Sequence, residues 1–314
     1  MSTSGAQPTS GANAGTDISP TGRYVVFTSE ATNLVTGDTN NAADVFLRDS
    51  QTAVTVRVSI ADDEAEGQLG GYGGLASSDG RYVAFSSDSE NLVALDTNQS
   101  TDVFLRDRVA GTTTRVSRGG TEGDGSSYLQ SMTPNARFIV FASDAENLIG
   151  TEDQNFSTDV FLRDRTLSKT ERVSVDTDGA EGDVDSSGGS ISDDGRYVTF
   201  ISNASNFDPD DSGIYADVYV RDRNVAAPLT TRLTALPNGD EADSDSSNAL
   251  ISGDGRVVVF DTDAGNLLSQ PDENATTDVY AKVLATGVTE RISTGLGNTD
   301  STDFSFVAGI SDDA

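Results

Sequence analysis

The stretch RYVAFSS, from Arg81 to Ser87, is rich in aromatic and β-branched residues and alternates with a period of two. Such a composition is typical of a β-strand. The stretch recurs four more times, as RYVVFTS, RFIVFAS, RYVTFIS and RVVVFDT. The arginines that begin the five copies, Arg23, Arg81, Arg137, Arg196 and Arg256, lie 58, 56, 59 and 60 residues apart. The chain is therefore built from repeated units.

Each unit contains three further strand-like pieces around this stretch. In the second unit they are GLASSDG (74–80), DVFLRD (102–107) and TTRVS (113–117). Gly, Ser, Asp and Asn interrupt the chain every ten residues or so, which argues against any sustained helix. Four short antiparallel strands in a unit of about 50 residues are typical of a β-propeller blade. We therefore predict an all-β fold, a single β-propeller domain of four-stranded antiparallel blades.

The number of blades follows from counting the pieces. The repeat units are predicted at residues 2–59, 60–117, 118–174, 175–234 and 235–293, followed by a closing strand within 294–314. The inner piece occurs a sixth time, since ISDD at 310–313 repeats ISDD at 191–194. We predict five blades, with residues 304–311 closing the ring as an innermost strand and so covering an exposed edge. A six-bladed ring is the alternative.

The repeated signature resembles a known family. Ser78-Asp79-Gly80-Arg81 through Phe85, Asp102 to Asp107 and Arg115 to Ser117 are similar to the WD40-like (PD40) repeats of TolB-type β-propellers. The resemblance covers nearly the whole chain and implies the propeller fold. Such propellers serve as periplasmic scaffolds, as gating domains of peptidases and as surface proteins, so the resemblance does not decide the function. The long NLV-x-x-DTN loop resembles a subgroup of exported bacterial propellers.

Composition excludes several classes of function. The chain has 51 Asp and Glu against 20 Lys and Arg, a net charge of −31, and it has no His and no Cys. This charge repels nucleic acid and anionic lipid, so neither is an expected partner. Without His or Cys there is no Ser-His-Asp triad, no thiol nucleophile and no ordinary zinc site. Cations that bind oxygen ligands, calcium above all, remain as expected partners.

The cellular location is inferred from what the sequence lacks. No apolar run approaches the ~20 residues of a membrane span. The start, MSTSGAQPTSGANAG, has none of the features of a signal peptide. We expect an exported protein whose signal has been removed, located in the periplasm, at the cell surface or outside the cell. We further expect a monomer with a protein or glycan partner.

A second motif, Asp-x-Asn-x-x-x-Asp, precedes the DVFLRD strand. Calcium takes six to eight oxygen ligands from Asp, Asn and backbone groups within a tight loop. The alternative is that Asp and Asn only form Asx-turns that lead into the strand. The fourth copy has Gly213 instead of Asn and is expected to be the weakest site. The candidate ligands are Asp38, Asn40 and Asp44; Asp96, Asn98 and Asp102; Asp153, Asn155 and Asp159; Asp211 and Asp217; and Asp272, Asn274 and Asp278.

Two other charged patterns repeat. Acidic loops follow the RVS pieces at 62–67, 120–125, 178–185 and 239–245, and we interpret them as solvated surface loops. The DVFLRD strand and its fourth-unit variant end in Arg-Asp, at Arg48, Arg106, Arg163 and Arg221. We interpret each of these arginines as pairing with the Asp beside it at the edge of the blade.

The sequence favours a non-enzymatic, secreted or cell-surface propeller that acts as a binding or scaffold module with calcium-binding loops. Its units are nearly equivalent, whereas catalysis needs an asymmetric site. Two alternatives stay open. One is a glycoside hydrolase that uses two carboxylates, although the chain has no Trp to stack on a sugar. The other is a structural spacer module of a longer surface protein.

Overall fold

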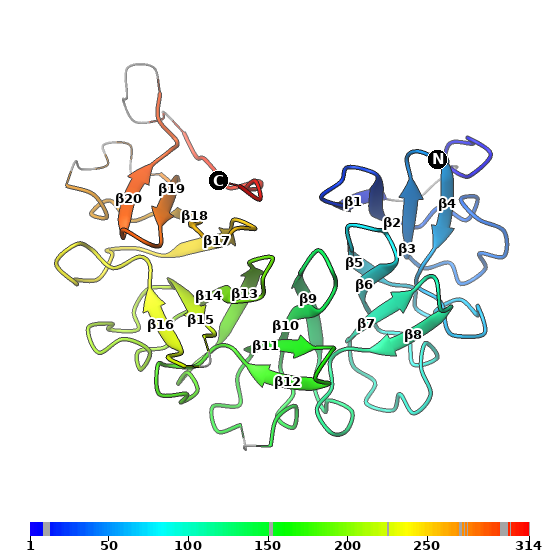
Figure 1. Cartoon of the computed structure of the whole chain (residues 1–314), viewed down its shortest axis with the longest axis horizontal. Helices are drawn as coiled ribbons and strands as arrows, with labels where there is room; N and C mark the ends of the chain where they lie inside the picture. Colours follow the sequence, from blue (N-terminus) through cyan, green and yellow to red (C-terminus); the bar gives the residue numbers. More distant parts are fainter. Residues whose placement is uncertain are drawn as a thin grey trace. The chain divides into compact units, whose positions relative to one another are not determined.

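A computed structural model describes residues 1–8, 13–150, 153–224, 226–269, 272, 274, 276–295, 301 and 303–313. Within these residues the chain forms twenty β-strands and no helix, so it contains no helix that could cross a membrane (Figure 1). The chain divides into two compact units, Met1–Glu152 with Leu162–Glu171, and Asp153–Phe161 with Arg172–Ala314.

The strands form five four-stranded antiparallel sheets in the part of the chain that is described. In each sheet the strands are neighbours in chain order, as in a propeller blade. The first sheet contains β1 (Asn13–Ile18), β2 (Tyr24–Ser29), β3 (Asp44–Asp49) and β4 (Val54–Arg57). The second contains β5 (Tyr72–Ala76), β6 (Tyr82–Ser87), β7 (Asp102–Asp107) and β8 (Thr112–Arg115).

The remaining sheets repeat this order. The third contains β9 (Ser127–Met132), β10 (Phe138–Ser143), β11 (Asp159–Asp164) and β12 (Lys169–Arg172). The fourth contains β13 (Ser186–Ile191), β14 (Tyr197–Ser202), β15 (Asp217–Asp222) and β16 (Leu229–Arg232). The fifth contains β17 (Ser246–Ile251), β18 (Val257–Thr262), β19 (Asp278–Val283) and β20 (Val288–Arg291). The predicted all-β, five-bladed propeller fold is confirmed.

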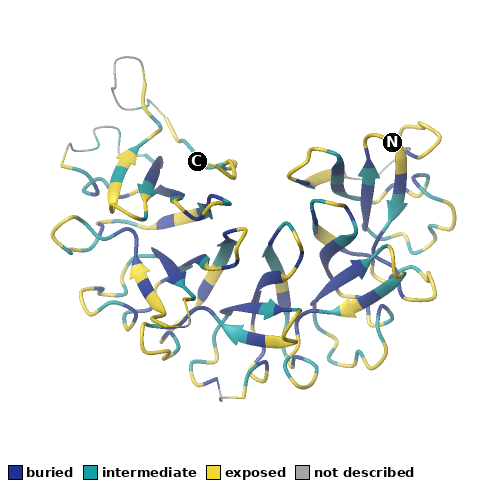
Figure 2. Cartoon of the chain, viewed as in Figure 1, coloured by how far each residue is buried: buried dark blue, intermediate teal, exposed yellow. Residues whose placement is uncertain are grey.

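The RYVAFSS-type strands lie inside the sheets and carry the core. In the second sheet β6 pairs in register with β7, from Tyr82 opposite Asp107 to Ser87 opposite Asp102. Phe85 and Phe104 face each other across this pair with ring centroids 5.8 Å apart, and neither is exposed to solvent. Figure 2 shows that burial is concentrated in the two central strands of the sheets. Burial of large side chains of this kind contributes roughly 1.5–3 kcal/mol each.

The Arg-Asp pairs differ from the prediction. Asp107, at the end of β7, does not pair with its neighbour Arg106. It accepts hydrogen bonds from Nε and NH2 of Arg81, the arginine of the Gly-Arg turn, the shortest at 3.0 and 2.7 Å. The antiparallel register brings Arg81 there, because the residue after it, Tyr82, lies opposite Asp107. The same pairs occur in three other sheets, Arg23 with Asp49, Arg137 with Asp164 and Arg196 with Asp222.

The arginine within each DVFLRD strand instead contacts the connector that enters its sheet. Arg106 donates to the carbonyl oxygen of Ala61 at 3.0 Å. Arg221 donates to that of Asp176 at 2.7 Å. In an antiparallel strand successive side chains point to opposite faces, so Arg106 and Asp107 do not pair with each other. Sequence proximity was therefore a poor guide to pairing.

The C-terminal segment forms no strand at residues 304–311. It nevertheless contacts the fifth sheet as the inner strand of a following sheet would. Ser305 N donates to Thr277 O at 2.9 Å, as Ser246 N donates to Ala216 O at 2.8 Å within the fourth and fifth repeats. Val307 N donates to Oδ1 of the fully buried Asp261 at 2.7 Å. Closure of a ring by this segment stays a prediction.

Deletion of residues 303–314 is expected to lower the melting temperature by several degrees. The deletion removes the hydrogen bond to Asp261, and an unsatisfied buried polar group costs about 1–3 kcal/mol. Differential scanning calorimetry of the deletion variant beside the parent measures the effect. An unchanged melting temperature would mean that these contacts contribute nothing to stability.

Candidate metal centre

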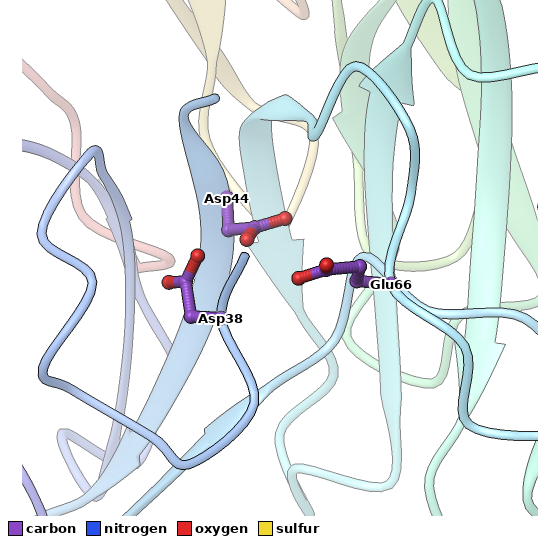
Figure 3. Close-up of side chains that lie close together, drawn as sticks. All are labelled: Asp38, Asp44 and Glu66. Carbon is purple, nitrogen blue, oxygen red and sulfur yellow. The ribbon is translucent and has the colours of Figure 1, made fainter. Parts of the chain in front are cut away.

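Four clusters of three carboxylates lie at equivalent places in the first four repeats. In each, one oxygen per side chain can be chosen so that all three lie within 4.8 Å of one another, a spacing that suits a metal ion. Figure 3 shows the carboxylates of the first cluster turned toward one another. The clusters are Asp38, Asp44 and Glu66; Asp96, Asp102 and Glu122; Asp153, Asp159 and Glu181; and Asp211, Asp217 and Glu241.

The two aspartates of each cluster are those of the predicted motif. Asp44 is the first residue of β3, and Asp38 lies in the loop before it. Asp44 Oδ1 accepts a hydrogen bond of 2.6 Å from the hydroxyl of Ser59, the serine of the RVS piece. The corresponding serine or threonine contacts the second aspartate in the other four repeats, as Ser117, Ser174, Thr234 and Ser293.

The asparagine of the motif forms a turn within its own loop. Asn40 Oδ1 accepts a hydrogen bond from Ala42 N at 2.9 Å, which is an Asx-turn. Its Nδ2 donates to Gly67 O at 2.8 Å, so the amide nitrogen faces the cluster and the oxygen faces its own backbone. The same pair of contacts holds Asn98, Asn155 and Asn274. These contacts give the asparagines the role of forming Asx-turns, which was the alternative to calcium binding.

The glutamate is the third carboxylate of each cluster, and the motif did not contain it. Glu66 lies in the acidic loop after β4, and its carboxylate accepts from Thr39 N at 3.0 Å and from the Thr39 hydroxyl. Glu122, Glu181 and Glu241 contact the same loop position in their own repeats. A signal was present in the sequence: the glutamate follows the arginine of the RVS piece by nine residues in three repeats and by seven in one.

An arginine stands among the carboxylates of each cluster. Arg57, the last residue of β4, places NH1 2.9 Å from Asp44, 2.7 Å from Glu66 and 3.7 Å from Asp38. Its side chain is only 8% exposed, and those of Asp44 and Asp38 are 0% and 2% exposed. The equivalents are Arg115, Arg172, Arg232 and, in the fifth repeat, Arg291. The arginine thus occupies part of the space that a metal ion would use.

One guanidinium does not balance three carboxylates. Burial raises the pKa of Asp96 to about 6, against the opposing charge of Arg115. Burial likewise raises the pKa of Asp159 and of Asp217 to about 6. Asp38 Oδ1 is buried and has no hydrogen-bond partner. Burial also opposes ionisation of Glu122, but hydrogen bonds from Thr97 and Arg115 outweigh it and lower its pKa to about 2.

The fourth cluster is built differently. Tyr219 replaces the phenylalanine found in the first three repeats, and its hydroxyl donates to Asp211. Asp208 adds a further carboxylate, with its Oδ2 3.3 Å from Arg232 Nε. In the fifth repeat Arg291 lies 3.4 Å from Asp272 and 3.2 Å from Asp278. The residue that the spacing equates with Glu66 there is Asp300, outside the described residues.

The aspartates of the clusters are inaccessible to a large substrate. Their aspartate side chains are at most 3% exposed, so a sugar or peptide cannot reach them. A glycoside hydrolase needs two carboxylates that flank an accessible substrate. Two aspartates and a glutamate recur in four repeats, and the fourth cluster adds Asp208 and the hydroxyl of Tyr219. Hard oxygen ligands in this number suit calcium.

No protein-family model matches the sequence, and no curated protein matches it. Solved structures match in fold. A TolB protein of Agrobacterium tumefaciens matches with a TM-score of 0.53 at 15% identity, over 90% of this chain and 80% of its own. TolB of Acinetobacter baumannii matches with a TM-score of 0.51 at 15% identity, over 89% of this chain and 53% of its own.

A peptidase contains a similar propeller. The acylaminoacyl peptidase of Pyrococcus horikoshii matches with a TM-score of 0.51 at 13% identity, over 88% of this chain. The chain spans 38% of that peptidase and about half of the A. baumannii protein. At these identities the likeness concerns the fold, and the conclusion is that this chain has the fold of the TolB-type β-propellers.

Proposed function

We propose that this protein is a non-enzymatic binding propeller, exported from the cell, whose carboxylate clusters take up calcium and whose surface presents a binding face to a protein or glycan. One observation carries the calcium assignment. Two aspartates with buried side chains and a partly buried glutamate converge on a single arginine, which leaves two formal negative charges in each cluster. A buried charge without compensation is expensive, and a divalent cation supplies the missing charge.

The ligands for calcium are the two aspartates and the glutamate. In the first cluster Asp38 Oδ1 can bind calcium, since it is buried and has no hydrogen-bond partner, with Arg57 NH1 3.7 Å away. Asp44 and Glu66 share their remaining oxygens with Arg57, so calcium binds in competition with the guanidinium. Water completes the coordination shell, as is common for calcium. The asparagines of the motif position the loop and are not ligands.

The binding role rests on the fold and on the near-equivalence of the repeats. The TolB proteins of A. tumefaciens and A. baumannii share the propeller fold with 90% and 89% of this chain. A rigid propeller whose loops are held together by calcium suits recognition of a partner better than turnover of a substrate. The chain has no His and no Cys, which removes the cysteine nucleophile and the histidine base that many peptidases use.

Titration calorimetry with calcium tests the proposal. The parent is expected to bind at least three equivalents, and Asp96→Asn is expected to lose one of them. Asp96 is chosen because Asn keeps the shape of the side chain and removes one ligand charge. Glu90→Gln is the matched control, because Glu90 is an exposed acid of the same repeat outside the cluster.

Magnesium at the same concentration separates site binding from charge screening. Its small octahedral shell dehydrates reluctantly, so it should not reproduce the calcium heat. If the parent gives no calcium heat above a sodium chloride blank of equal ionic strength, the clusters are ion-pair networks and the calcium assignment is wrong.

A further inference from the structure

The N-terminal segment, residues 1–7, packs against β4, the outer strand of the first sheet. Hydrogen bonds with Arg48 and Thr55 hold it. Thr55 Oγ1 donates to the carbonyl oxygen of Met1 at 2.7 Å, Arg48 NH1 donates to that of Ser2 at 3.0 Å, and Thr55 N donates to Thr3 Oγ1 at 3.0 Å. The outer strand is otherwise the edge of its sheet, since it has one strand neighbour, β3.

In the second sheet the same three contacts are made by the connector that arrives from the first. Thr113 Oγ1 donates to Ile60 O at 2.5 Å, Arg106 NH1 to Ala61 O at 3.0 Å, and Thr113 N to Asp62 Oδ1 at 2.7 Å. In the fourth sheet Thr230 and Arg221 contact Val175, Asp176 and Thr177 in the same way.

The backbone of the segment also has the form of a connector. Ser2 N donates to Ala6 O at 3.0 Å, and Gly5 has a φ of +82°. The two connectors repeat both features. Ala61 N donates to Ala65 O, and Asp176 N donates to Ala180 O. Glu64 and Gly179 have φ values of +67° and +92°.

An asparagine side chain binds the backbone at the end of each of these segments. Asn33 donates to Gln7 O at 2.7 Å, Asn91 to Glu66 O at 2.9 Å and Asn206 to Glu181 O at 2.7 Å.

We propose that the slot formed by Arg48, Thr55 and β4 is a peptide-binding site, which the chain fills with its own residues 1–7. Its ligand is a short extended peptide of the connector type. The first two carbonyl groups of the peptide accept from Thr55 and Arg48, the third residue offers a Ser, Thr or Asp oxygen to Thr55 N, and the fifth adopts a positive φ. Another protein that carries such a segment can occupy the slot in place of residues 1–7.

The three contacts explain both the affinity and the selectivity. Each neutral hydrogen bond contributes about a factor of two to ten to binding, and the contact with the Arg48 guanidinium somewhat more. Residues 1–7 have an advantage over a free peptide because they are tethered to the slot, which gives them an effective concentration in the millimolar range. A free peptide therefore competes only when residues 1–7 are weakened. Glycine is preferred at the fifth position because a β-branched residue is strained at a φ of +82°.

The test weakens the segment within the full chain. Thr3→Val with Gly5→Val removes the acceptor for Thr55 N and disfavours the turn, and no atom lies near enough to Gly5 for the new side chain to clash. The probe is a fluorescently labelled peptide of residues 1–8, followed by anisotropy. We expect the double variant to bind it at least tenfold more tightly than the parent. An unlabelled peptide of residues 175–182 should displace it.

Two controls test whether the peptide binds in this slot. Adding Thr55→Val to the double variant removes one donor and is expected to weaken peptide binding about fivefold, with no change in the circular dichroism spectrum. A labelled peptide with Thr3→Val and Gly5→Val should bind at least tenfold more weakly than the native peptide. If the double variant binds no peptide, or binds it no better than the parent, the slot is only a packing contact and the proposal is wrong.

Discussion

Arg115→Met is expected to destabilise the calcium-free protein by about 3–5 kcal/mol, the cost of leaving buried charges without their partner. The side chains of Arg115, Asp96 and Asp102 are 6%, 3% and 0% exposed. Methionine fills much of the space of the arginine but carries no charge, so two buried aspartates and a partly buried glutamate remain together without a positive partner. Urea unfolding in the presence of EDTA measures the loss.

The same variant is expected to bind calcium more tightly than the parent, because the ion no longer competes with the guanidinium. At a calcium concentration a hundredfold above Kd, one site restores about 2.7 kcal/mol. Arg118→Met is the control, since Arg118 is an exposed arginine three residues away and its replacement should change stability by less than about 0.5 kcal/mol. A variant as stable as the parent in EDTA would show that the arginine does not hold the cluster together.

The stability of the calcium-free protein is expected to fall as the pH rises through about 6. Burial raises the pKa of Asp96, Asp159 and Asp217 from 3.8 to about 6. The folded protein therefore binds these protons more strongly than the unfolded chain does, and this contribution to stability is complete below pH 3.8 and lost above pH 6. Glu66 and Glu122 have lowered pKa values, and their contribution is lost on acidification below about pH 4.5.

Calcium is expected to offset the stability that the calcium-free protein loses as the pH rises toward 6 and above. The ion binds the ionised carboxylates, so its stabilising effect grows between pH 5 and pH 7, while that of magnesium stays small. Thermal melts with calcium and with EDTA across this range give the difference directly. Asp159→Asn removes one of the titrating groups and should flatten the slope in EDTA. If stability depends on pH in the same way with and without calcium, the titrating aspartates do not bind the ion, and this result would count against the proposed sites.

The local sequence pattern was sufficient to predict the strands of the blades. The strand RYVAFSS and its partner DVFLRD contain their own periodicity, and Gly80 has a φ of +66° at the turn that the Gly-Arg pair predicts. The turn residues between pieces are equally local. For this reason the amino-acid sequence alone is enough to predict the strands, their antiparallel order and the five-fold repeat.

The first and last residues of the candidate metal motif were also predictable, because Asp38 and Asp44 belong to one short loop. The role of Asn40 was not, since a motif does not reveal which atom of an amide faces the cluster. In the structure its oxygen closes an Asx-turn and its nitrogen reaches Gly67.

Only the tertiary structure decided which charges meet. Arg57 enters the cluster because the register of β3 and β4 places it opposite Phe46, two residues beyond Asp44. Glu66 arrives from a loop that the sequence describes merely as acidic, and it is held there by Thr39, 27 residues earlier in the chain. Hydrogen bonds and ion pairs depend on position in space to within about 1 Å. The amino-acid sequence by itself determined the strands and the repeat, whereas the sharing of one arginine by three carboxylates depended on how the sheets and loops pack together.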